Sequence, residues 1–285
     1  KEKKIFNDDF SNNIKKELSY ELTSDQKNAL NEINNDLKSE EKMFRLLQGD
    51  VGSGKTIIAL ISCFNVVNSG YQVAFMAPTE ILAYQHYRLA QSLLKDKIKI
   101  GFLTSKTDYT ERKKIIKDLE ANKIKILFGT HSVFQEKINY NKLGLIVIDE
   151  QHKFGVKQRK KLSDKGGKNC DVLVMSATPI PRTMIMTIFG DMDVTIIKQK
   201  PKNRKPVKTY SKVDTKLSEI IDFTKKQIKK GNQIFWVCTL IEESKKVDHQ
   251  SAVQRYNGLQ KIFKDRAGLL HGSLDKVDKD KILNK

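Results

Sequence analysis

Short apolar segments alternate with longer amphipathic segments along most of the chain. The apolar segments are rich in Val, Ile, Leu and Phe, and they predict strands at Arg45–Gln48, Gln72–Met76, Ile98–Leu103, Ile124–Phe128, Leu143–Ile148 and Val172–Met175. Helical periodicity lies between many of them, at Lys55–Asn68, Glu80–Leu94 and Thr110–Leu119. Continuous apolar strands that alternate with helices are typical of a mostly parallel sheet covered on both faces. The pattern therefore predicts an α/β fold with a ligand site at the carboxyl ends of the strands.

The alternation breaks at residues 198–206, where the sequence KQKPKNRKP is charged and holds two of the five prolines. Such a segment is typical of a linker. Beyond it we expect helices at Leu217–Lys229 and Lys246–Phe263 and strands at Gln233–Cys238 and Ala267–Leu270. Because a doubly wound domain usually has more strands, we expect a partial second domain. The chain does not begin with Met, so we expect it to start inside a longer polypeptide.

Composition narrows the class of protein. Hydrophobic residues make up 39% and charged residues 31% of the chain, as in a globular protein. No apolar run approaches the roughly 20 residues that span a bilayer, and the first ten residues are too polar for a signal peptide. Cys63, Cys170 and Cys238 are widely spaced in apolar surroundings, which indicates reduced thiols in a cytoplasmic protein. We expect no membrane association and no structural metal, and nothing in the sequence implies an oligomer.

The net charge of +19 fits a polyanionic partner such as nucleic acid. Only 8 of the 53 basic residues are Arg, however, and no single basic run dominates. A genome-wide preference for Lys explains the charge equally well. The charge alone therefore does not decide whether the partner is nucleic acid, and the motifs have to decide it.

The clearest motif is GDVGSGKT, which matches the phosphate-binding pattern G-x-x-x-x-G-K-[ST]. It follows a predicted strand and opens a predicted helix, as the pattern requires. The glycines let backbone N–H groups point at phosphate oxygens, aided by the helix N-terminus. The pattern assigns Lys55 to the β- and γ-phosphates and the Thr56 hydroxyl to Mg²⁺. The predicted ATP-binding residues of this loop are Gly49, Asp50, Val51, Gly52, Ser53, Gly54, Lys55 and Thr56.

Two further strand ends carry candidate chemistry. The apolar strand at residues 143–148 leads into Asp149 and Glu150. In a nucleotide hydrolase, Asp149 would hold Mg²⁺ through its water shell, and Glu150 would orient and deprotonate the attacking water. Ser176 and Thr178 follow another strand, where their hydroxyls can bond the acidic strand end. Alone, two acids are often the start of a loop, and Ser-Ala-Thr is often a turn or a helix cap.

Together these strings resemble the motifs of superfamily 2 helicases. GDVGSGKT, APTE (77–80), GTH (129–131), DEQH (149–152) and SAT (176–178) resemble motifs I, Ia, Ib, II and III. FGVKQR (154–159), ATPIPRT (177–183) and WVCTLIEES (236–244) are similar to strings of the RecG family, bacterial ATP-dependent helicases that remodel branched DNA. The resemblance runs from Leu22 to the end of the chain.

The resemblance implies a domain organisation and a function. We expect an N-terminal connector at residues 1–21, a first RecA-like P-loop domain at 22–197, the linker at 198–206, and a partial second RecA-like domain at 207–285. ATP and Mg²⁺ are the implied cofactors. Double-stranded or branched DNA, such as replication forks and Holliday junctions, is the implied partner. The implied role is recombination and repair in the bacterial cytoplasm.

The resemblance also implies roles for single residues. Gln26, in the string LTSDQ, would read the adenine edge, while Thr23 in the same string is also a good helix N-cap. Gln151, His152, Ser176 and Thr178 would couple the ATP site to the DNA side, although His152 is also readily explained as a loop residue. The predicted DNA contacts are Thr79, Thr104, Thr130, His131, Arg182, His271 and Gly272.

Other interpretations stay open. The transcription-repair coupling factors share an ATPIPRT-like string but typically read DEEH and GYGKT, so Gln151 and Ser53 favour the RecG family. RecG members usually carry Thr-Gly-Ser after the third strand, where this chain has Thr104, Ser105 and Lys106. Motifs V and VI do not occur in the 285 residues. Motif VI supplies an arginine to the γ-phosphate, so the isolated chain could be a nucleotide- and DNA-binding module with little turnover. Transporter-type ATPases are disfavoured because no Leu-Ser-Gly-Gly signature occurs.

Overall fold

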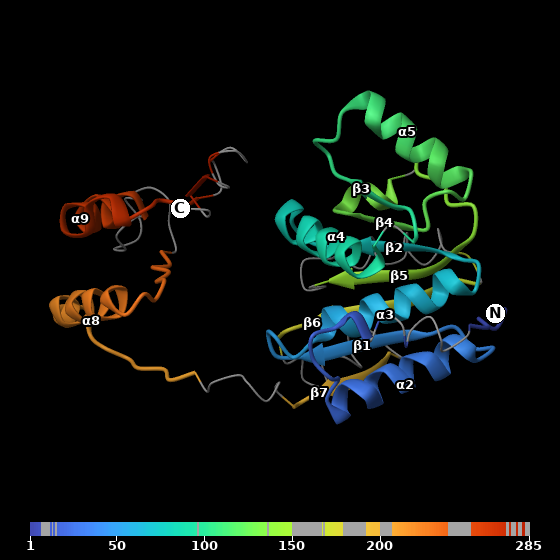
Figure 1. Cartoon of the computed structure of the whole chain (residues 1–285), viewed down its shortest axis with the longest axis horizontal. Coiled ribbons are helices and arrows are strands. Elements are labelled where there is room, and N and C mark those ends of the chain that lie inside the picture. Colours follow the sequence, from blue (N-terminus) through green and yellow to red (C-terminus); the bar gives the residue numbers. More distant parts are fainter. Residues whose placement is uncertain are drawn as a thin grey trace. The chain divides into compact units, whose positions relative to one another are not determined.

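The computed structural model describes residues 1–6, 12, 14, 16–95, 97–135, 137–149, 167, 169–178, 192–199, 207–238, 252–271, 274, 278 and 281–282. It divides into two compact units, Lys1–Lys205 and Pro206–Lys285. The first unit contains a sheet with helices on it, and the described part of the second unit is helical (Figure 1). Each unit is described by itself.

The first unit is built on a seven-stranded sheet with the order β3-β4-β2-β5-β6-β1-β7. Every strand pair in it is parallel. The strands are β1 (Phe44–Gly49), β2 (Gln72–Met76), β3 (Ile100–Leu103), β4 (Ile126–Gly129), β5 (Leu143–Asp149), β6 (Asp171–Ser176) and β7 (Asp193–Ile197). The predicted α/β fold with a parallel sheet is confirmed, and β7 is an additional strand that the apolar pattern did not predict.

Burial along the strands explains why the inner ones were visible in the sequence. β2, β4, β5 and β6 are buried at every position, which requires continuous apolar runs. The edge strands β3 and β7 alternate between more and less buried positions. An edge strand such as β7 therefore carries a weaker hydrophobic signal than an inner strand.

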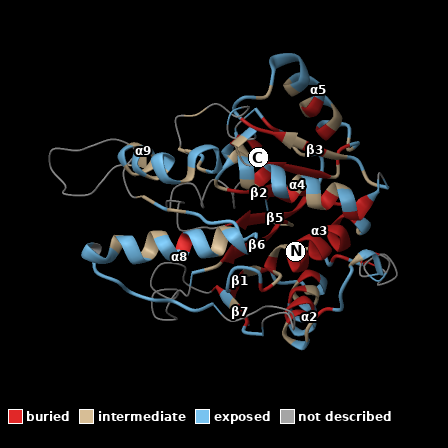
Figure 2. Cartoon of the chain, turned by 60° about the vertical axis from the view of Figure 1, so that its left-hand side comes forward, coloured by how far each residue is buried: buried red, intermediate tan, exposed pale blue. Residues whose placement is uncertain are grey.

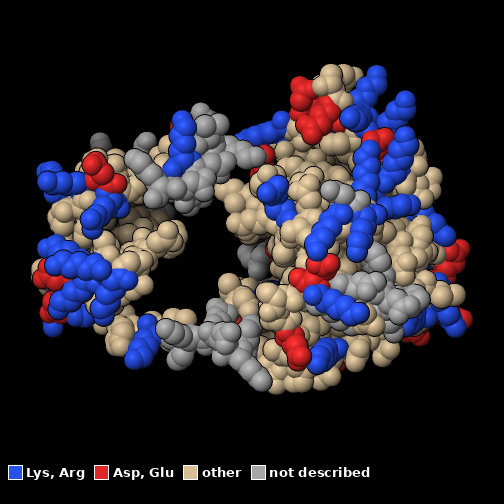
Figure 3. Space-filling model, viewed as in Figure 1, with Lys and Arg blue, Asp and Glu red and all other residues tan. Residues whose placement is uncertain are grey.

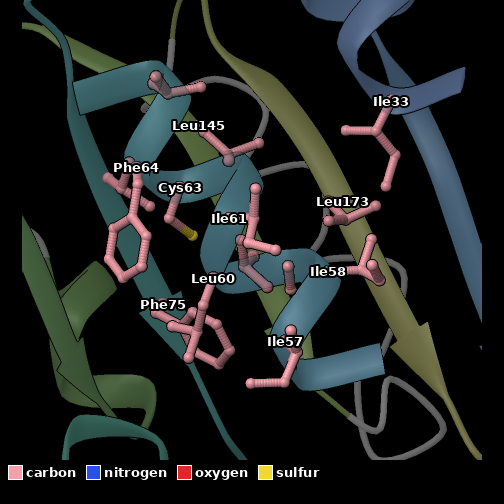
Figure 4. Close-up of a cluster of buried hydrophobic side chains, with 14 of the residues drawn as sticks. Ile33, Ile57, Ile58, Leu60, Ile61, Cys63, Phe64, Phe75, Leu145 and Leu173 are labelled. Atoms are coloured by element: carbon pink, nitrogen blue, oxygen red, sulfur yellow. The ribbon is translucent and has the colours of Figure 1, made fainter. Parts of the chain in front are cut away.

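Helices cover both faces of the sheet. The helices α2 (Ser24–Lys38), α3 (Lys55–Asn68) and α4 (Glu80–Leu94) pack on one face, and α5 (Tyr109–Glu120) with the 3-10 turn η1 (His131–Phe134) packs on the other. Helix α3 is buried almost all round (Figure 2). Its apolar side chains meet residues of α2, β2, β5 and β6 (Figure 4). Each such side chain contributes about 1.5–3 kcal/mol on burial, so α3 is fixed firmly in the centre of the unit.

The helix starts differ in how their free N–H groups are satisfied. Thr23 and Gln26 form a reciprocal capping box at the start of α2, Thr79 caps α4, and Asp108 caps α5. The residue before helix α3 is instead Gly54, which provides no side-chain cap. A helix start without a side-chain cap is typical of a phosphate-binding loop.

The first six residues are anchored at the amino end of β6. The ammonium groups of Lys1 and Lys4 lie 2.6 and 2.5 Å from the two oxygens of Asp171. The backbone N–H of Met43 donates to the same carboxylate at 2.8 Å. These contacts join the start of the chain to the end of the sheet opposite the predicted site.

The second unit differs from its prediction. Its described elements are η3 (Asp214–Lys216), α8 (Leu217–Lys229), α9 (Ala252–Phe263) and η4 (Lys264–Arg266). Helix α8 has the predicted bounds, whereas the strands expected at residues 233–238 and 267–270 are not formed. Phe235 is 78% and Val237 is 87% exposed, so the apolar run has no covering layer. Alternating apolar residues form a strand only where a neighbouring strand supplies hydrogen bonds. The described part of this unit contains no such neighbouring strand.

The described residues include all three cysteines and the helices that were considered as membrane spans. Cys63 and Cys170 are buried free thiols, and Cys238 is a half-buried free thiol, as expected for reduced cysteines. Burial raises the pKa of the Cys63 thiol well above its ordinary value. No described helix has both the length and the hydrophobicity to cross a membrane.

Candidate functional site

The carboxyl edge of the sheet divides into two halves. On one side, the GDVGSGKT loop follows β1, Ser176 ends β6, and Asp149 ends β5. On the other side, Thr79 follows β2, Thr130 follows β4, and Thr104 follows β3. The predicted nucleotide residues thus occupy three adjacent strand ends, and predicted DNA residues occupy the next three.

The phosphate-binding loop has the geometry that its sequence predicts. Gly52 and Gly54 have φ angles of 76° and 92°, in the left-handed region that favours glycine. The Lys55 ammonium donates to the carbonyls of Gly49 at 2.6 Å and Asp50 at 3.2 Å, so it lies in the concave side of the loop. The Ser53 hydroxyl is buried and has no hydrogen-bond partner among the described residues. Together these groups form a cradle suited to phosphate oxygens.

Gln26 supports this loop from outside. Its side-chain nitrogen donates to the Ser53 carbonyl at 2.7 Å, and its side-chain oxygen accepts from the Thr23 N–H at 2.9 Å. A Cβ atom at Gly54 would lie 2.3 Å from the Gln26 nitrogen, so only glycine fits there. Gln26 is 2% exposed and fixes the loop against the start of α2. Contact with adenine remains a prediction.

Asp149 lies at the carboxyl end of β5 and is 8% exposed. One of its oxygens is 2.7 Å from Nε2 of His86 on α4. Its strand is two places from β1 in the sheet, which separates the two strand ends by about 10 Å. Asp149 and the GDVGSGKT loop therefore lie on the same edge of the sheet, with one strand between them.

The candidate metal ligands fit Mg²⁺ in their chemistry. Thr56 is the second residue of α3, directly after Lys55. The hydroxyl of Thr56 and the carboxylate of Asp149 are hard oxygen donors, which Mg²⁺ prefers together with water. No group of three or more His, Cys, Asp and Glu side chains forms a metal cluster in the described part of the chain. The donors therefore suit a hydrated Mg²⁺ ion.

Ser176 and Thr178 form a tight turn at the end of β6. Their hydroxyl oxygens are 3.0 Å apart, and the Thr178 N–H donates to the Ser176 hydroxyl at 3.2 Å. Gln48, at the end of β1, donates to the Thr178 carbonyl at 3.5 Å. The turn is thus tied to the strand that carries the phosphate loop, and its coupling role remains a prediction.

The predicted DNA residues differ in how accessible they are. Thr79 and His131 are exposed and Thr130 is half-buried, whereas Thr104 is 3% exposed. The Thr104 hydroxyl accepts from the Lys106 N–H at 3.3 Å and closes a turn. In the second unit, His271 is half-buried, and its Nδ1 has no partner among the described residues. Figure 3 shows Lys and Arg side chains over α4 and α5, mixed with fewer acidic ones.

Five predicted residues lie outside the described residues: Glu150, Gln151, His152, Arg182 and Gly272. Conversely, His86 contacts the predicted metal ligand but was not predicted from the sequence. His86 shares the buried face of α4 with Ala83 and Ala90. A histidine at helical spacing on a small apolar face is the signal that could have found it.

The fold and the phosphate loop define a class of protein. A parallel sheet with this loop after one strand and an acid at the end of another is typical of P-loop nucleotide-binding proteins. Residues 23–187 match the DEAD/DEAH box helicase family. The chain belongs to this family, which confirms the predicted helicase class.

Relatives within the family carry one name. ATP-dependent DNA helicase RecG of Bacillus subtilis is 46% identical over 271 residues, covering 94% of this chain and 40% of the relative. RecG of Thermotoga maritima is 45% identical, with 94% of this chain and 35% of the relative covered. The predicted resemblance to RecG is confirmed. The chain spans less than half the length of these relatives.

Two solved structures of helicases are similar to this chain. The structure of RecG bound to a three-way DNA junction matches 99% of this chain and 37% of its own, with a TM-score of 0.78 and 38% identity. The DEAD-box helicase Mss116 bound to single-stranded RNA matches 96% of this chain and 60% of its own, with a TM-score of 0.68 and 18% identity. The latter likeness concerns the fold alone.

Proposed function

We propose that this chain is the motor region of an ATP-dependent DNA helicase that remodels branched DNA. The observation that carries the proposal is the carboxyl edge of the first unit, where the phosphate loop follows β1 and Asp149 ends β5, two places away in the sheet. The names of the similar proteins supply the substrate class, since they are ATP-dependent DNA helicases, one of them bound to a three-way DNA junction. Replication forks and Holliday junctions are such branched substrates, and the proposed place of action is the bacterial cytoplasm.

Each residue of the nucleotide half has a proposed task. The loop N–H groups and Lys55 bind the β- and γ-phosphates, and Lys55 neutralises part of their charge. Thr56 and Asp149 orient the metal ion and its water shell. A bound Mg²⁺ would supply positive charge next to the phosphates. Gln26 is the proposed adenine contact, and its bond to the Ser53 carbonyl would transmit base binding to the loop.

The DNA half is proposed to bind backbone rather than bases. Thr79, Thr130 and His131 are exposed or half-exposed at the ends of β2 and β4. Hydroxyl, imidazole and helix N-terminal groups suit phosphate oxygens. Such contacts carry no sequence information, as a motor that moves along any DNA requires. Arg182, His271 and Gly272 are proposed additional contacts.

Binding of a fluorescent ATP analogue tests the proposal. Replacement of Lys55 by Ala should weaken binding by about 10- to 100-fold, because a buried charge-assisted bond is lost. Equilibrium titration of the 285-residue chain in the presence of Mg²⁺ measures the change. Lys27→Ala is the matched control, since Lys27 is exposed on α2 and carries the same charge.

Two results would contradict the proposal. Equal nucleotide affinity in Lys55→Ala and wild type would remove the phosphate-loop assignment. If the wild-type chain binds a three-way junction no better than a linear duplex of equal length, with or without nucleotide, the assignment to branched DNA is wrong for this part of the protein.

A further inference from the structure

His86 occupies an unusual place for an ionisable side chain. It lies on the buried face of α4 and is 7% exposed. One side of its ring packs on Phe75 of β2, with ring centroids 5.0 Å apart. Its Nε2 atom is 2.7 Å from Oδ2 of Asp149, and no other hydrogen bond of the His86 side chain occurs within the described residues. Packing thus fixes the ring, and the ring fixes one carboxylate oxygen.

The direction of this hydrogen bond follows from the chemistry of the two groups. An ionised carboxylate can only accept, so the proton must reside on Nε2 of His86. The donated bond occupies Oδ2 of Asp149. Oδ1 of Asp149 accepts no hydrogen bond from the described side chains. Within the described residues, one oxygen is therefore held in place and the other is left to the water shell of a metal ion.

Helix α4 places His86 at the border between the two halves of the carboxyl edge. The helix starts beside Thr79, after β2, and β2 is paired directly with β5, which ends in Asp149 (Figure 1). Thr79 accepts a bond from the Leu82 N–H and so belongs to the same rigid helix as His86. One helix therefore carries a predicted DNA contact at its start and the contact to the predicted metal ligand two turns later.

We propose that His86 is a positioning residue that holds the Asp149 carboxylate in the orientation needed to bind the magnesium water shell. This role of His86 rests on the proposed ATP-driven function and adds His86 to the residues of the proposed magnesium site. It also gives α4 a physical role, because any shift of this helix moves the hydrogen-bond donor of Asp149. A donor that orients a metal-binding group typically changes metal affinity by about 10- to 100-fold.

The test uses Mn²⁺ as a probe of the metal site. Electron paramagnetic resonance measures the affinity of the 285-residue chain for Mn²⁺ in the presence of a non-hydrolysable ATP analogue, and a titration without metal measures nucleotide binding. His86→Leu removes the donor but fills the space. His86→Gln restores a donor, because the glutamine nitrogen is the same number of bonds from Cα as Nε2 of histidine. Leu94→Ala is the packing control, since Leu94 is 1% exposed on the same helix and makes no contact to Asp149.

We expect Mn²⁺ to bind about 10- to 100-fold more weakly to His86→Leu than to wild type. His86→Gln should recover most of the affinity, and metal-free nucleotide binding should be the same in all variants. Leu94→Ala should lower thermal stability with wild-type Mn²⁺ affinity. If His86→Leu binds Mn²⁺ like wild type, or if Leu94→Ala weakens Mn²⁺ as much, the inference is wrong. A wild-type chain that binds no nucleotide would instead refute the proposed function.

Discussion

Two buried carboxylates lie at opposite ends of neighbouring strands, and the protein treats them differently. Asp171 begins β6 beside Leu145, and Asp149 ends β5 beside Met175. Asp171 is fully buried, and both of its oxygens accept bonds from ammonium groups. Asp149 is 8% exposed, and its only described side-chain donor is His86.

The difference separates a structural charge, Asp171, from the proposed metal-binding charge, Asp149. The negative charge of Asp171 is compensated by Lys1 and Lys4, and the Met43 N–H occupies a further lone pair. Nothing remains for a ligand to bind. A carboxylate such as Asp149, with one oxygen that no described side chain contacts, retains the capacity to bind a hydrated ion. The number of satisfied lone pairs thus indicates which end of the sheet is the site.

The largest effect is expected at the closed end. Asp171→Ala should lower the free energy of unfolding by about 3–5 kcal/mol, because it leaves buried ammonium groups without a partner. Urea unfolding measures the loss. Adding Lys4→Met to Asp171→Ala should recover part of it, because an apolar side chain needs no counter-charge there. A loss below about 1 kcal/mol would show that the charge cluster is not buried in solution.

The open end should respond in the opposite way. Asp149→Ala should reduce Mn²⁺ affinity in the presence of nucleotide at least as much as loss of its donor does, that is about 10- to 100-fold. Its free energy of unfolding should fall by only about 1–3 kcal/mol, because the buried Nε2 of His86 loses its acceptor while a poorly compensated charge is removed. The same two measurements on Asp171→Ala give the reverse pattern. If Asp149→Ala unfolds as readily as Asp171→Ala, the contrast between the two ends is false.

The sequence predicts the first unit well because its signals are local. The bounds of α3 and α4 agree with the prediction at both ends, since Gly54 and Thr79 mark their starts and apolar periodicity marks their length. β7 was missed because an exposed edge strand lacks a continuous apolar run. The strands expected in the second unit were wrong, because an apolar pattern at residues 233–238 cannot show whether a neighbouring strand is present.

The residues of the candidate site also differ in whether the local sequence predicts them. Lys55 and Thr56 were predictable because eight consecutive residues build their loop. The contact between His86 and Asp149 joins positions 63 residues apart, and only the packing of α4 on β2 and β5 brings them together. Local motifs therefore predict candidate ligand-binding groups, whereas the residues that contact those groups from distant positions are found only in the fold.

The smallest expected effect is a pH dependence at the closed end. Tyr71, just before β2, donates to Glu2 at 2.5 Å, and Cys170 precedes Asp171. Burial, followed by the hydrogen bond to Glu2, raises the pKa of Tyr71 from 10.0 to about 12. Burial raises the pKa of the Cys170 thiol from 9.0 to about 12. Both groups are therefore held neutral in the folded state.

The sign of the pH dependence follows from these raised values. Between pH 9 and 12 the unfolded chain loses protons that the folded chain keeps, so the free energy of unfolding falls as pH rises and is unaffected by these groups below pH 9. Urea unfolding from pH 8 to 11 should give a shallower fall in Tyr71→Phe and Cys170→Ala than in wild type. Asp149→Ala, at the other end, should keep the wild-type slope. Equal slopes in all four proteins would show that Tyr71 and Cys170 titrate freely, and that the end of the sheet around Asp171 admits water as readily as the end around Asp149.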